Sequence, residues 1–156
     1  MARHRTVSVE RLINAPAERI FDVLADPSRR CEIDGSGTLV QMTSSQARLA
    51  LGSTFSMRVR VGVTYPTNNR VLEFEESRLI EWAHWQGQRW RYELEPQDDG
   101  GTLVRETFNW GTSRWPRVAE LFGAHKKNVP NMEATLARLA ALVEPAADGD
   151  TQLDPS

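Results

Sequence analysis

The chain has 156 residues, of which 40% are hydrophobic and 26% charged, and its formal net charge is −2. These values are typical of a single globular domain. The slightly negative net charge and the scattered positions of the Lys and Arg residues argue against nucleic acid as a partner. No apolar run is long enough to span a membrane, and the only cysteine, Cys31, cannot form an internal disulfide. We therefore expect a cytoplasmic protein that binds no nucleic acid and does not span a membrane.

The chain is predicted to open with a strand and two short helices. Apolar residues alternate to one face of Thr6–Ile13, which is expected to be the strand, and Arg11 points to the same face. The helices are expected at Ala17–Ala25 and at Ser28–Glu32, each opened by a proline.

Six further strands follow, separated by turn signals. They are predicted at Thr38–Met42, Thr54–Val63, Asn69–Glu76, Leu79–Trp85, Arg89–Glu95 and Thr102–Trp110. Connections this short require antiparallel neighbours. The pattern therefore predicts an antiparallel meander with one concave face.

The stretch Thr112–Val143 is predicted to form a long helix. Its inward residues recur at alternating steps of four and three. They are Val118, Phe122, His125, Val129, Met132, Leu136, Leu139 and Val143. Because Gly123 lowers helix propensity and Pro130 removes a backbone hydrogen bond, we expect a kink or a break into two helices between Gly123 and Asn131.

These elements together predict an α+β fold. A curved seven-stranded antiparallel sheet is expected to wrap around the C-terminal helix and to bury its apolar stripe. No repeat or linker divides the chain, so residues 5–143 are expected to form one domain. Residues 144–156 contain four acidic residues and no Lys or Arg, which predicts a disordered acidic tail.

The opening VSVERLINAPAERIFDVLADP, at Val7–Pro27, resembles the start of polyketide cyclase/dehydrase-like proteins of the START-like (SRPBCC) superfamily. The strands Asn69–Glu76, Leu79–His84 and Gly101–Phe108, followed by the terminal helix, agree with this resemblance, which covers about residues 5–143. It implies a helix-grip fold with a hydrophobic pocket between sheet and helix. It does not imply a particular ligand, because members share a cavity rather than a catalytic signature.

Strand parity and the predicted hairpins bring two rows of directly opposed side chains onto the concave face. The rows are Trp82–Tyr92–Glu106 and His84–Trp90–Phe108, with Trp110 beyond. A buried carboxylate must be paired, hydrogen-bonded or neutral. Tyr92 is the expected partner of Glu106, and Arg11 is an alternative. The pair is either a structural hydrogen bond in a filled core or a polar anchor in a pocket wall, and the third alternative is that Glu106 points outward.

Three hypotheses for function follow. In the first, the protein binds a small hydrophobic or aromatic molecule, polycyclic ones included, in the cavity. The expected lining residues are Arg11, Met57, Phe74, Trp82, His84, Trp90, Tyr92, Glu106, Phe108, Trp110, Phe122, His125 and Met132.

In the second hypothesis the protein is an enzyme similar to polyketide cyclases and dehydrases. His84 and His125 would meet across the pocket, and with Glu106 and Tyr92 they are the candidates for acid–base catalysis. Each histidine is alternatively an ordinary core or rim residue. In the third, the protein is an interaction module, which an exposed apolar patch would favour. We expect no cofactor and no metal site, since no His or Cys pair stands at ligand spacing, and the protein is expected to be a monomer or homodimer.

Overall fold

The computed structural model describes residues 4–42 and 48–145. Its strands are β1 (Thr6–Ile13), β2 (Leu39–Met42), β3 (Thr54–Val61), β4 (Val63–Glu75), β5 (Leu79–His84), β6 (Arg89–Pro96) and β7 (Thr102–Asn109). Its helices are α1 (Ala17–Leu24), the 3₁₀ turn η1 (Pro27–Arg29), α2 (Arg30–Ile33), α3 (Pro116–Leu121) and α4 (Ala124–Val143). The predicted tail lies, from residue 146 onward, outside the described residues.

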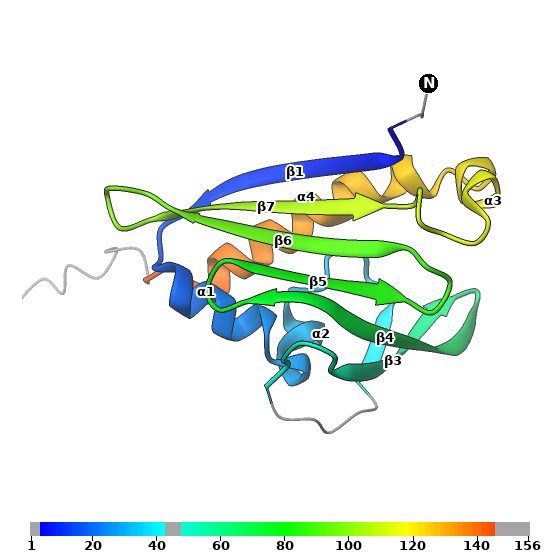
Figure 1. The fold of residues 1–156 in the computed structure, drawn as a ribbon, viewed down its shortest axis with the longest axis horizontal. Coiled ribbons are helices and arrows are strands. Elements are labelled where there is room, and N and C mark those ends of the chain that lie inside the picture. The colour runs from blue at the N-terminus through cyan, green and yellow to red at the C-terminus, as the bar shows by residue number, and fades with distance from the viewer. Residues whose placement is uncertain (1–3, 43–47, 146–156) are drawn as a thin grey trace, which may run out of the picture.

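The seven strands form one antiparallel sheet in the order β1-β7-β6-β5-β4-β3-β2. Helix α4 runs along one face of this sheet. Helices α1 and α2 lie between the C-terminal half of α4 and the part of the sheet formed by β2 to β4 (Figure 1). The predicted α+β helix-grip architecture is confirmed. None of the described helices is long and apolar enough to cross a membrane.

Helix α4 packs on the sheet through its C-terminal half. The stripe that the sequence predicts is buried there, and it packs with apolar side chains of the sheet and of α1. The buried stripe residues are Met132, Leu136, Leu139 and Val143. This face anchors the helix, because burying each such side chain stabilises the fold by roughly 1.5–3 kcal/mol.

The predicted break in the long helix occurs at Gly123, whose φ of 68° is left-handed. Because of this break, α3 does not continue the stripe of α4. Phe122 is 70% exposed and Val118 is also exposed, so the expectation that both point inward is wrong. The side of α3 that faces the protein carries Glu120, which accepts hydrogen bonds from Arg5 Nε (2.8 Å) and Trp110 Nε1 (3.1 Å).

Two connections differ from the predicted ones. Strand β4 begins at Val63 rather than Asn69, since Gly62, with φ of 75°, turns the chain back directly after β3. In the β5–β6 hairpin, Trp82 pairs with Trp90, which is two residues from the predicted register. The paired part of β5 therefore ends earlier in the chain than predicted. A shift of two residues nevertheless keeps every side chain on its predicted face.

A short segment between α2 and β2 docks directly on α4. The backbone N–H of Gly35 donates to Thr135 Oγ1 (3.0 Å), and Arg138 Nη1 donates to the carbonyl oxygen of Asp34 (2.6 Å). A Cβ atom at Gly35 would overlap the carbonyl oxygen of Asn131 and the backbone nitrogen of Thr135. Only glycine fits this approach, because both obstacles are backbone atoms that cannot move aside.

We predict that Gly35→Ala lowers the free energy of unfolding by about 2–3 kcal/mol, because the added methyl group must push the segment away from α4. Gly37→Ala is the matched control: a Cβ there meets nothing, so only its left-handed φ of 69° is penalised, by about 1 kcal/mol. Urea unfolding of both variants measures the difference. Equal losses would contradict the close approach.

Candidate functional site

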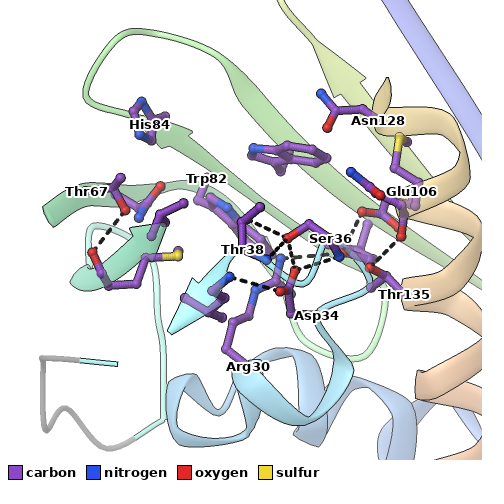
Figure 2. A pocket seen from close by; sticks show the side chains of 18 of the residues that line it. Arg30, Asp34, Ser36, Thr38, Thr67, Trp82, His84, Glu106, Asn128 and Thr135 are labelled. Atoms are coloured by element: carbon purple, nitrogen blue, oxygen red, sulfur yellow. Dashed lines mark hydrogen bonds between the residues drawn. The ribbon is translucent and has the colours of Figure 1, made fainter. Parts of the chain in front are cut away.

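A cavity of about 220 Å³ lies between the concave face of the sheet, the α2–β2 segment and α4 (Figure 2). Strands β3 to β7 form its floor, and α4 closes one side with Asn128, Asn131, Met132 and Thr135. The opposite side is built by α2, which carries Arg30, and by the segment that joins α2 to β2. The position of the cavity is the one that the sequence predicts.

Seven of the thirteen expected lining residues line this cavity. They are Met57, Trp82, His84, Trp90, Tyr92, Glu106 and Met132. All but Met132 come from the sheet, where strand parity is a reliable guide to the face on which a side chain lies.

Three expected residues lie on other surfaces. Arg11 is exposed on β1, at the edge of the sheet, so it is not a partner of Glu106. Phe74 packs edge-on against Phe21 of α1, with ring centroids 5.3 Å apart, at the far end of β4. Phe122 follows α3 directly and is exposed to solvent.

The other three expected residues belong to an aromatic stack beside the cavity. Phe108 lies against Trp90, with centroids 4.4 Å apart, and Trp110 lies between Phe108 and His125, at 5.9 and 5.2 Å. None of Phe108, Trp110 and His125 lines the cavity. The expectation that His125 meets His84 across the pocket is therefore wrong, because the stack occupies that part of the hollow.

Most of the polar side chains that line the cavity were not predicted from the sequence. They are Arg30 of α2, Asp34, Ser36 and Thr38 of the α2–β2 segment, Thr67 and Asn69 of β4, and Asn128, Asn131 and Thr135 of α4. Figure 2 labels Arg30, Asp34, Ser36, Thr38, Thr67, Asn128 and Thr135 among them. Leu39, Val59 and Tyr65 complete the wall. Alternation could have indicated the β4 pair once that strand was extended to Val63. No local pattern indicates Arg30, because its position depends on how α2 packs.

The buried polar centre of the cavity is a chain of three side chains. Tyr92 Oη donates to Glu106 Oε1 at 2.8 Å, and Arg30 Nη2 donates to Tyr92 Oη at 3.5 Å. Tyr92 and Glu106 are almost completely buried. The predicted Tyr92–Glu106 pairing between β6 and β7 is confirmed.

Burial dominates the ionisation of this centre. It raises the pKa of Glu106 to about 7, although the Tyr92 hydrogen bond and the positive charge of Arg30 oppose the shift. The negative charge of Asp34 adds to it. Burial also raises the pKa of the Tyr92 hydroxyl, so that this group stays protonated. Glu106 is thus close to half protonated at neutral pH, which suits it to exchange a proton or to donate a hydrogen bond.

Arg30 is held by aromatic faces rather than by a carboxylate. Its guanidinium carbon lies 4.3 Å from the ring centroid of Trp82 and 5.5 Å from that of Tyr92. Asp34 is occupied elsewhere: its carboxylate accepts from the backbone N–H groups of Ser36 (3.1 Å) and Leu39 (3.2 Å). Within the described ranges, no ion pair neutralises Arg30.

His84 lies on the other side of the cavity from Glu106 (Figure 2). The backbone N–H of Gln86 donates to its Nδ1 at 3.2 Å, and burial lowers the pKa of the imidazole while Gln88 partly opposes this. The ring is therefore neutral. Over residues 4–42 and 48–145, no three His, Cys, Asp or Glu side chains are arranged to hold a metal ion.

A family model described as "Polyketide cyclase / dehydrase and lipid transport" matches residues 4–144 of the chain. The uncharacterized protein Rv0088 of Mycobacterium tuberculosis is 37% identical over 133 residues, which are 82% of this chain. The match covers 59% of that protein, so the chain spans less than two thirds of the length of this relative.

Solved structures share the fold at low identity. The protein CV1439 of Chromobacterium violaceum is 19% identical with a TM-score of 0.68, over 90% of this chain and 98% of its own. An AHSA1-like protein of Aeromonas hydrophila is 18% identical with a TM-score of 0.61, over 88% and 93% of the two chains. Likeness at this level shows the architecture and leaves the contents of the cavity to be argued from its residues.

The raised pKa of Glu106 predicts a pH-dependent stability. Between the ordinary value of 4.5 and about 7, the folded state binds more protons than the unfolded state, so stability falls as the pH rises through this window. The full shift corresponds to roughly 3 kcal/mol. Glu106→Gln keeps an acceptor for Tyr92 and should remove this loss.

Urea unfolding at about pH 5 and about pH 8 measures the effect. From about pH 5 to about pH 8, the free energy of unfolding of the wild type should fall by up to about 3 kcal/mol more than that of Glu106→Gln. Glu133→Gln, on the exposed side of α4, is the matched control and should follow the wild type. Parallel profiles for wild type and Glu106→Gln would show that Glu106 is already ionised in the folded protein.

Proposed function

Because the chain belongs to the polyketide cyclase/dehydrase and lipid transport family, we propose that it binds one small, mainly aromatic or apolar molecule in the cavity between the sheet and α4. The observation that carries this proposal is the composition of the wall. Aromatic rings from β5 and β6 line the floor, and a few polar groups gather at Arg30, Tyr92 and Glu106. Ligand sites typically combine an apolar wall with a small number of polar groups that set orientation.

The size of the cavity narrows the class of ligand. An engineered apolar cavity of about 150 Å³ holds benzene. A volume of about 220 Å³ therefore suits one or two fused rings, and a larger polycycle requires α4 or the α2–β2 segment to move outward. The stack that contains Trp90 and Phe108 limits the cavity on one side, because its rings are already in contact.

We predict that bicyclic probes such as 2-naphthol and 2-naphthoate change the tryptophan emission of the protein in a saturable manner, since Trp82 and Trp90 line the cavity. Val59→Phe adds a ring to the wall and should weaken binding by at least about tenfold, because it fills the space that the probe needs.

Val61→Phe is the matched control, since it introduces the same side chain on the same strand at a position that is 61% exposed. It should bind like the wild type. Equal weakening by both variants, or no response to either probe in the wild type, would count against the cavity as a binding site.

One observation favours a second candidate function, an acid–base enzyme that eliminates water from a β-hydroxy carbonyl compound. Glu106 has a pKa of about 7 and faces the cavity beside the Tyr92 hydroxyl. Its carboxylate would take the proton next to the carbonyl group, and the resulting neutral carboxyl group would give that proton to the departing hydroxyl group, which leaves as water as the C–O bond breaks and the C=C bond forms. The candidates are now Glu106, Tyr92 and His84, since His125 lies outside the cavity.

An aryl β-hydroxy ketone tests this, because its dehydration forms a conjugated enone that absorbs at longer wavelength. If the protein is such an enzyme, Glu106→Gln should slow turnover by about 100-fold or more, while binding of 2-naphthol changes little. His125→Gln serves as the control and should retain turnover. Saturable binding without turnover would contradict the enzyme hypothesis and support ligand binding as the function.

A further inference from the structure

The cavity contains buried polar atoms that lack a partner. Across the described residues, five buried side-chain polar atoms make no hydrogen bond, and three of them belong to residues that line this cavity. These are Arg30 Nη1, Asn69 Nδ2 and Glu106 Oε2. Leaving such a group unpaired costs about 1–3 kcal/mol, so native structures rarely contain several together unless a ligand or water satisfies them.

Two of the three atoms are hydrogen-bond donors, and the third can become one. Arg30 Nη1 and Asn69 Nδ2 carry hydrogens at any physiological pH. Glu106 Oε1 already accepts from Tyr92, so a proton on the carboxyl group is free to reside on Oε2 and to point at a ligand. The cavity therefore offers donors and lacks a matching acceptor.

The charges around the cavity favour an acceptor that is negative. Arg30 is buried at Nη1, has no carboxylate within salt-bridge distance in the part of the chain that is described, and rests on the ring of Trp82. The other titratable groups that line the cavity are Asp34, Tyr65, His84 and Tyr92, while α4 contributes only uncharged side chains. Both carboxylate oxygens of Asp34 already accept hydrogen bonds from backbone N–H groups that follow it in the chain.

We propose that the ligand of this cavity is an aromatic or apolar acid, whose carboxylate is bound between the guanidinium of Arg30 and the protonated carboxyl group of Glu106. The ring system lies against Trp82 and Trp90, and the charged end reaches the Arg30–Tyr92–Glu106 centre. This deepens the proposed function and rests on it. A cationic ligand is disfavoured, because it would face the unpaired guanidinium.

The proposal implies that binding takes up a proton. A carboxylate beside Glu106 repels the ionised form of that side chain and accepts a hydrogen bond from the neutral form. Glu106 is close to half protonated in the free protein at neutral pH, so binding should complete its protonation. The affinity for an organic anion should therefore fall as the pH rises above neutrality, and a neutral ligand should show no such dependence.

A matched pair of probes tests the proposal: 2-naphthoate and its neutral isostere 2-naphthamide, with affinities from calorimetry and tryptophan emission. The wild type should bind naphthoate at least about tenfold more tightly than naphthamide at about pH 6, because the guanidinium forms a charge-assisted hydrogen bond with the carboxylate alone. Naphthoate affinity should fall roughly tenfold between about pH 6 and about pH 8, and naphthamide affinity should stay constant.

The proton uptake can be measured without any variant. At about pH 7, calorimetry in phosphate and in Tris, which have different ionisation enthalpies, should report uptake of about half a proton per naphthoate bound and none per naphthamide. This readout remains decisive even where a variant fails to fold. Zero uptake with tight naphthoate binding would overturn the role of neutral Glu106.

Variants separate the contributions. Arg30→Leu should lower the affinity for naphthoate by at least about tenfold and change the affinity for naphthamide by less than about twofold. Glu106→Gln should remove the pH dependence of naphthoate binding. Arg29→Leu, one residue earlier and paired with Glu32 on the surface, is the control and should bind like the wild type. Equal binding of both probes by the wild type would overturn the acid-ligand proposal while leaving the proposed function intact, whereas binding of neither would refute both.

Discussion

The backbone contact between Gly35 and α4 is the constraint on which the cavity depends. It holds the α2–β2 segment directly on the helix, since a residue without Cβ lets the two backbones touch and lets Gly35 N–H reach Thr135. The same segment contributes Asp34 to the lining, and α2, which leads into it, contributes Arg30. A curved sheet and a helix alone would leave an open trough. This third element, together with α2, narrows the trough into a partly open pocket, and α2 supplies its positive charge.

The polar groups buried around the cavity cost folding free energy, which packing elsewhere in the protein must offset. Glu106 gives up hydration, and three lining residues hold buried polar atoms without partners. The C-terminal half of α4, with Leu136, Leu139 and Val143 fully buried, provides the compensating apolar contacts away from the cavity. Helix α4 thus has two roles along its length: residues from Leu136 to Val143 anchor it on the protein, and residues between Asn128 and Thr135 border the cavity.

Particular residues show how far the sequence could predict this arrangement. The pairs Tyr92–Glu106 and Trp90–Phe108 could be predicted, because alternation fixes the face of a strand and a short hairpin fixes its neighbour. Phe122 could not be placed correctly, since the helical period predicts a face only while the helix is continuous, and Gly123 ends that continuity. Arg30 could not be assigned at all. It lies in a four-residue helix, where no periodicity is available, and it reaches Tyr92 across 62 positions of sequence.

The aromatic content of the concave face has two separate roles, and their division decides what the cavity can do. The rings of Phe108, Trp110 and His125 stack on one another and fill part of the hollow, while Trp82 and Trp90 remain facing the open space. The filled half keeps His125 away from any ligand, so the candidate side chains left for proton transfer are Glu106 and its neighbour Tyr92, beside Arg30, with His84 on the other side of the cavity. Binding of an acid and acid–base catalysis make opposite demands on the carboxyl group of Glu106, because the first needs it protonated and the second needs it to accept a proton. A pKa of about 7 leaves both states populated at neutral pH, and the charge of the bound molecule then determines which state prevails.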